Sequence, residues 1–128
     1  MKKVLILIVD DEEDVLKMLG KRLTIEGYSV ITATNGADAI TLAKSQRPDI
    51  IVLDIIMPEM EGDEVAAELK EHPLTRNIPV IFLTALRSKA EEKESGSIVG
   101  NNITLSKPLD PEILLDKIKK LLPVTAAS

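Results

Sequence analysis

The chain contains no cysteine and no tryptophan, and its only aromatic residues are Tyr28 and Phe82. The absence of cysteine excludes disulfides and thiolate metal sites, and it fits a reducing compartment. With so few rings, the core must be built from valine, isoleucine, leucine and alanine, and little is available to stack nucleobases. The formal charge of -5 and the lack of a basic stripe also disfavour contacts with a phosphate backbone. We therefore expect no direct nucleic-acid binding by this segment.

Long apolar runs are missing as well. No stretch approaches the roughly 20 apolar residues that a membrane-spanning helix needs, so we expect no membrane insertion and a soluble, cytoplasmic protein. The opening MKKVLILIV has the lysines and apolar run of a signal peptide, but it leads into an unbroken acidic stretch, residues 10–14, where a signal would have small residues. We interpret this opening as a buried strand.

The length of 128 residues corresponds to one domain. Hydrophobic residues make up 45% and charged residues 29%, both close to the averages of globular proteins. We assign residues 1–122 to the domain and residues 123–128, PVTAAS, to a flexible tail.

Short apolar runs alternate along the chain with longer amphipathic segments. The short runs are predicted strands, several of them covered on both faces: residues 4–9, 29–33, 50–53, 80–83 and 103–105. The amphipathic segments are predicted helices: residues 13–26, 37–45, 63–71 and 110–122. A fifth helix within residues 88–102 should be short or mobile, because that segment has few apolar anchors and contains Gly96.

This alternation predicts an α/β fold, a doubly wound five-stranded parallel sheet with right-handed crossovers and helices on both faces. In an open parallel sheet the carboxyl ends of the strands lie along one edge, where such folds bind their ligands. The predicted strands lead into Asp10 and Asp11, Asp54, Thr84 and Lys107. We expect these residues, far apart in sequence, to converge.

Three carboxylates at one edge would repel one another, by roughly 4 kcal/mol for a pair at about 4 Å and an effective dielectric of 20. A cation would relieve this repulsion. All the candidate ligands are oxygens and the single histidine, His72, lies in a different loop, which favours a hard ion such as Mg²⁺ over zinc. A carboxylate beside a metal, an ammonium group and a hydroxyl is equipped to accept a phosphoryl group.

Four motifs, IVDDEED, VLDIIMPEMEG, FLTA and LSKP, occur in this order over nearly the whole chain. Together they resemble the receiver domain of two-component response regulators. The resemblance implies a flavodoxin-like sheet with strand order 2-1-3-4-5. It also implies a signalling module that takes a phosphoryl group from a sensor histidine kinase or a histidine phosphotransfer protein and then changes its binding surface for a downstream protein.

The same resemblance implies a role for each residue at the strand ends. Asp54 would be the phosphoacceptor, and Asp11 and Asp54 with the backbone carbonyl of Ile56 would hold Mg²⁺. Asp10 would act through metal-bound water. Thr84 and Lys107 would sense the phosphoryl group.

The sequence departs from the family pattern at three positions. Thr104 stands where the family often has an aromatic residue, which leaves the mode of switching open. Ile56 and Leu86 stand where the family often has polar residues.

Two other function classes remain open. One is a receiver-like docking scaffold that works without phosphorylation, although the intact acidic residues and Lys107 argue against it. The other is a Mg²⁺-dependent aspartyl phosphatase, although the residues after Asp54 lack the second acid which that chemistry needs. A dinucleotide-binding domain is weaker still, since no G-x-G-x-x-G follows the first strand. Whether the chain is a stand-alone regulator or a piece of a longer protein is also open.

Overall fold

A computed structural model describes residues 3–55, 57, 60–84, 98–99, 102–106 and 110–122. Its centre is one β-sheet with the strand order β2-β1-β3-β4-β6-β5. Five of these strands run parallel to one another: β1 (Leu5–Val9), β2 (Ser29–Ala33), β3 (Ile50–Asp54), β4 (Val80–Thr84) and β6 (Asn102–Ser106). The sixth, β5 (Ile98–Val99), pairs antiparallel with β6 at the edge.

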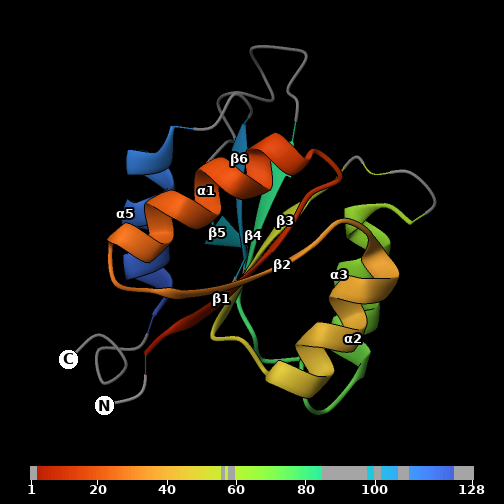
Figure 1. Ribbon diagram of the computed structural model, residues 1–128. Helices are drawn as coiled ribbons and strands as arrows, with labels where there is room; N and C mark the ends of the chain where they lie inside the picture. The colour runs from red at the N-terminus through yellow and green to blue at the C-terminus, as the bar shows by residue number, and fades with distance from the viewer. Residues whose placement is uncertain are drawn as a thin grey trace.

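Helices cover both faces of this sheet (Figure 1). Helices α1 (Glu13–Ile25) and α5 (Pro111–Leu121) lie on one face, and α2 (Gly36–Gln46) and α3 (Gly62–Glu71) lie on the other. Arg22 of α1 donates a hydrogen bond to Glu112 of α5, which ties the two helices of the first face together. Two helices begin at side-chain caps, because Asn35 accepts from the amide of Asp38 and Asp110 from that of Glu112.

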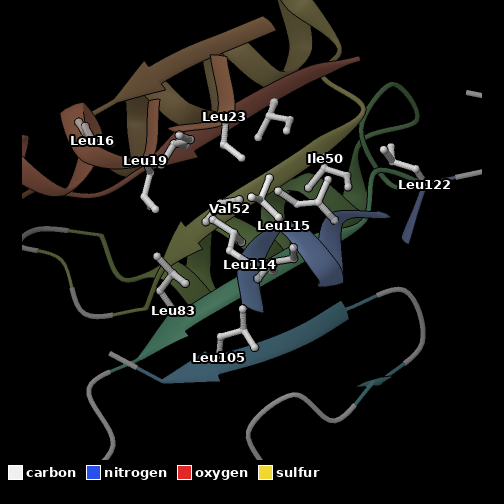
Figure 2. Close-up of a cluster of buried hydrophobic side chains, with 14 residues drawn as sticks. Leu16, Leu19, Leu23, Ile50, Val52, Leu83, Leu105, Leu114, Leu115 and Leu122 are labelled. Atoms are coloured by element: carbon white, nitrogen blue, oxygen red, sulfur yellow. The ribbon is translucent and has the colours of Figure 1, made fainter. Parts of the chain in front are cut away.

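Alternating residues of the central strands supply two separate apolar cores. In β1, Ile6 and Ile8 face the core under α1 and α5, whereas Leu7 and Val9 face the core under α2 and α3. Figure 2 shows the first core, where leucines of α1 and α5 gather over side chains of β3, β4 and β6. Because both faces are covered, the central strands had to be apolar up to their last residues, which is why they were recognisable as runs in the sequence.

The predicted doubly wound parallel sheet is confirmed. Its predicted strand order, 2-1-3-4-5, is confirmed as well, because β6 is the fifth of the parallel strands in chain order. The short antiparallel β5 was not predicted. It lies within segment 88–102, for which a short helix is predicted, and it shows that the helix does not extend to residues 98–99. Residues 88–97 lie outside the described residues, so the helix itself stays a prediction. Ile98 and Val99 are β-branched, and such residues fit a strand better than a helix.

Residues 85–97, and the predicted tail at 123–128, lie outside the described residues. Within the described parts of the chain, no helix is both long enough and apolar enough to cross a membrane.

Candidate functional site

Asp10 is the first residue after β1, and its side chain is fully buried. Its backbone N–H donates to the carbonyl of Ala33 at 3.1 Å, so the contact between β1 and β2 continues to the end of the strand. Its carboxylate Oδ1 accepts a hydrogen bond from the N–H of Glu12 at 2.9 Å. The chain therefore turns from β1 into α1 around this buried carboxylate.

Three consecutive acidic residues, Asp10, Asp11 and Glu12, form the acidic cluster of this edge. Each places one carboxylate oxygen within 4.8 Å of the others. Asp10 is buried, whereas Asp11 and Glu12 are exposed, so the cluster reaches from the interior to the surface. Beside it, a depression of about 540 Å³ is lined by Thr34 and by the acidic residues 11–14.

Asp54 is the last residue of β3, and only 3% of its surface is exposed. The register explains why it lies near the acidic cluster. Val9 pairs with Leu53, so Asp10 and Asp54 are each one residue further along neighbouring parallel strands. On the other side, Asp54 pairs with Leu83 of β4. The predicted phosphoacceptor therefore occupies the end of a strand that is flanked by strands on both sides.

The remaining predicted site residues are described only in part. Thr84 ends β4 and pairs with Ser106 of β6, which puts its backbone on the same edge of the sheet as Asp54. Lys107 follows directly after β6 but lies outside the described residues, as does Ile56. The roles of these residues in phosphoryl transfer stay predictions.

The acidic cluster fits a hard divalent cation. Carboxylate oxygens are the ligands that Mg²⁺ prefers, and the cluster offers no nitrogen or sulfur donor. Two like charges separated by 4.8 Å repel by about 1 kcal/mol in a water-like dielectric and by about 3 kcal/mol at an effective dielectric of 20. A bound cation would replace this repulsion by attraction.

Glu12 was not among the predicted site residues. The sequence did contain a signal for it, because it belongs to the acidic stretch after β1. Reasoning from strand ends selected only the first two residues after β1, Asp10 and Asp11. The hydrogen bond from the Glu12 amide to Asp10 makes a turn, and the Glu12 carboxylate lies near those of Asp10 and Asp11.

Comparison with known protein families shows which family the chain is similar to. The sequence model of the response regulator receiver domain family matches residues 6–119, nearly the whole chain. A solved structure of the chemotaxis protein CheY4 from Vibrio cholerae superimposes with a TM-score of 0.82 at 32% identity, covering 94% of this chain and all of CheY4.

Among curated proteins, the response regulator PleD of Caulobacter vibrioides is 40% identical over 116 residues, which are 91% of this chain and 25% of PleD. The alkaline phosphatase synthesis transcriptional regulatory protein PhoP of Bacillus subtilis is 36% identical over 117 residues, which are 91% of this chain and 48% of PhoP. The chain thus spans between a quarter and a half of the length of these two relatives.

Proposed function

The chain belongs to the response regulator receiver family and is a phosphoacceptor signalling module, and we propose that Asp54 is the residue that accepts the phosphoryl group. One observation carries this assignment. Asp54 is a buried carboxylate at the carboxyl end of β3, beside the strand that leads into the acidic cluster. In the reaction, a carboxylate oxygen of Asp54 bonds to phosphorus while the bond between phosphorus and the donor's histidine nitrogen breaks.

Asp11 and Asp54, with the backbone carbonyl of Ile56, are the proposed direct ligands of Mg²⁺, and Asp10 is proposed to act through metal-bound water. The oxygen donors of the acidic cluster suit this ion. When bound, Mg²⁺ neutralises charge on the phosphoryl oxygens. Asp10 and Asp11 would hold that positive charge next to Asp54, where it would offset the repulsion between these carboxylates and an incoming phosphate.

Thr84 and Lys107 are the proposed sensors of the phosphoryl group. Thr84 is the last residue of β4, and Lys107 follows the last residue of β6 in the sequence. These two strands are parallel neighbours in the sheet. A hydroxyl can donate to a phosphoryl oxygen, and an ammonium group can pair with it as a point charge. Both contacts would exist only when Asp54 is phosphorylated, so they would favour a different conformation of the loops that carry them.

The proposed donor is a sensor histidine kinase or a histidine phosphotransfer protein, and the proposed recipient of the signal is a downstream protein. The self-phosphorylation and self-dephosphorylation of Asp54 belong to signalling and not to the turnover of a free substrate. A cytoplasmic location is part of the proposal, because a cysteine-free chain suits a reducing compartment. The acidic charge of the chain argues against direct nucleic-acid binding by this segment.

Intact mass after incubation with a small-molecule phosphodonor and Mg²⁺ tests the assignment. Wild type should gain one phosphoryl group, and Asp54→Asn should gain none. Asp63→Asn is the matched control, because Asp63 is an exposed aspartate in the first turn of α3, and it should be labelled like wild type.

No gain in wild type, or equal gain in Asp54→Asn, would contradict the proposal. An unlabelled wild type that still binds its downstream partner would point to the docking scaffold. Sustained release of phosphate from phosphomonoesters would point to the phosphatase.

A further inference from the structure

The first residue of α3, Gly62, lies directly against the backbone of Asp54 and Ile55. Its N–H donates to the carbonyl of Ile55 at 2.8 Å. A Cβ added to Gly62 would lie 2.7 Å from the Cα of Ile55 and 3.0 Å from the carbonyl carbon of Asp54, and it would be closer still to the carbonyl oxygen of Asp54. Position 62 therefore has no room for any side chain.

The backbone that Gly62 touches cannot easily move away. On its other side, the N–H of Ile55 donates to the carbonyl of Leu83 at 2.9 Å, which extends the pairing of β3 with β4. The segment from Asp54 to Ile55 is thus held between β4 and the start of α3. Because the side chain of Asp54 projects from this held backbone, a shift of the backbone would turn the carboxylate.

A need for unusual backbone angles does not explain the glycine. Among the described glycines, only Gly27 has a positive φ, of 99°. Alanine would also be the better helix former at Gly62 if space were the same. The reason for glycine at this position is therefore the close approach of α3 to the backbone of the proposed phosphoacceptor.

We propose that Gly62 is a positioning residue for phosphoryl transfer, which sets the direction of the Asp54 carboxylate through the backbone of Asp54 and Ile55. This inference rests on the proposed function of Asp54. Displacing a reacting group by about 1 Å is enough to slow a reaction about 100-fold. The rate of phosphorylation should therefore depend on the absence of a Cβ at Gly62 beyond any loss of stability.

Gly36 provides a matched control. It is the first residue of α2, is buried like Gly62, and has no positive φ. Its added Cβ would also be crowded, at 2.7 Å from Cγ2 of Val65 and 2.8 Å from Sδ of Met60. These neighbours are side-chain atoms and not the backbone of the acceptor. Gly36→Ala should therefore lower stability without turning Asp54.

The experiment measures initial phosphorylation rates of wild type, Gly62→Ala and Gly36→Ala with a small-molecule phosphodonor at saturating Mg²⁺. It is run at a temperature where thermal melts show all three to be folded. We expect Gly62→Ala to be about 10- to 100-fold slower at every donor concentration, and Gly36→Ala to react like wild type. A wild-type rate for Gly62→Ala, or an equal loss in both variants, would overturn the inference. An unlabelled wild type would instead overturn the proposed function.

A second measurement uses wild type alone, and it decides the question if Gly62→Ala does not fold. The Gly62 amide is at a helix N-terminus, where N–H groups ordinarily have no partner within the helix. Its bond to Ile55 should protect it from hydrogen exchange, and phosphorylation of Asp54 should shift its resonance more than that of the Gly36 amide. Rapid exchange, or no larger shift at Gly62, would show that the contact does not report on the acceptor.

Discussion

The buried carboxylate of Asp10 accepts a hydrogen bond from the N–H of Glu12, with 2.9 Å between Oδ1 and the nitrogen. Glu12 is the N-cap of α1, and its own side chain makes no capping bond. Asp10 therefore contributes in two ways, because its side chain accepts a hydrogen bond at the start of α1 and its negative charge belongs to the acidic cluster. Asparagine keeps a hydrogen-bond acceptor without the charge, whereas alanine removes both, so the two variants separate the two contributions.

Asp10→Ala should lower the free energy of unfolding relative to Asp10→Asn by about 1–3 kcal/mol, because only alanine removes the acceptor of a partly buried amide. Both variants lose the carboxylate, so both should respond less to Mg²⁺ than wild type does. Chemical denaturation without and with Mg²⁺ measures both effects. Equal stability of the two variants would show that the Oδ1 contact contributes nothing.

Removing a charge at Asp11 should stabilise the protein in the absence of Mg²⁺. The carboxylates of the cluster lie within 4.8 Å of one another, and Asp11 and Glu12 are exposed to solvent, so relief of one such repulsion is worth about 1 kcal/mol, the value for a water-like dielectric. Mg²⁺ should raise the melting temperature of wild type but not of Asp11→Asn, because a ligand stabilises the state that binds it.

The control for Asp11 is Asp14→Asn. Asp14 lies in the first turn of α1 and outside the cluster, and its charge interacts favourably with the helix N-terminus. This variant should melt slightly lower than wild type and keep its response to Mg²⁺. An undiminished Mg²⁺ response in Asp11→Asn would remove Asp11 from the proposed ligands.

Lys107→Ala should still be phosphorylated but should transmit the change poorly. The lysine is proposed to contact the phosphoryl group after transfer, so its loss affects the response more than the acceptance. Amide spectra of residues 88–104, recorded before and after phosphorylation, measure the transmission. If wild type and the variant show the same spectral shifts, Lys107 is not the sensor.

The phosphorylated form should persist for many minutes to hours. Ile56 and Leu86 lie outside the described residues, and the family resemblance implies for them a place beside the path of the water that hydrolyses the acyl phosphate. Neither side chain can hydrogen-bond a water. Losing one contact that orients the water slows such a step by about 10- to 100-fold. Loss of the phosphoryl group after donor removal is followed in wild type and in Ile56→Asn with Leu86→Glu. A wild-type lifetime of seconds, or no acceleration in the double variant, would refute this expectation.

The sequence predicted the fold well where burial alone decides structure. Strands β1, β3 and β4 are covered on both faces, so they had to be continuous apolar runs. The antiparallel pairing of Ile98 with Ile103 could not be predicted in this way. A strand of two residues is too short to show an alternation of apolar and polar residues. It pairs with β6 because that side of β6 has no other strand beside it.

The candidate site was predicted only as a set of residue types at strand ends. The register of Val9 with Leu53 explains why that reasoning brought Asp10 and Asp54 to one edge. Reasoning from strand ends could not reveal the approach of Gly62 to Asp54, because a glycine at the start of a helix has the same appearance in a sequence whether it serves a turn or a close contact. That distinction depends on the path of the loop between them.

The sheet also acts as a partition inside the molecule. Each buried apolar side chain described belongs to one core or the other, and the odd and even positions of a strand such as β1 go to opposite sides. Substitutions on opposite sides therefore share no side-chain neighbours, and independent sites add within about 0.3–0.5 kcal/mol. A protein engineer could redesign the layer under α1 and α5 and the layer under α2 and α3 in separate libraries, and then combine the best of each.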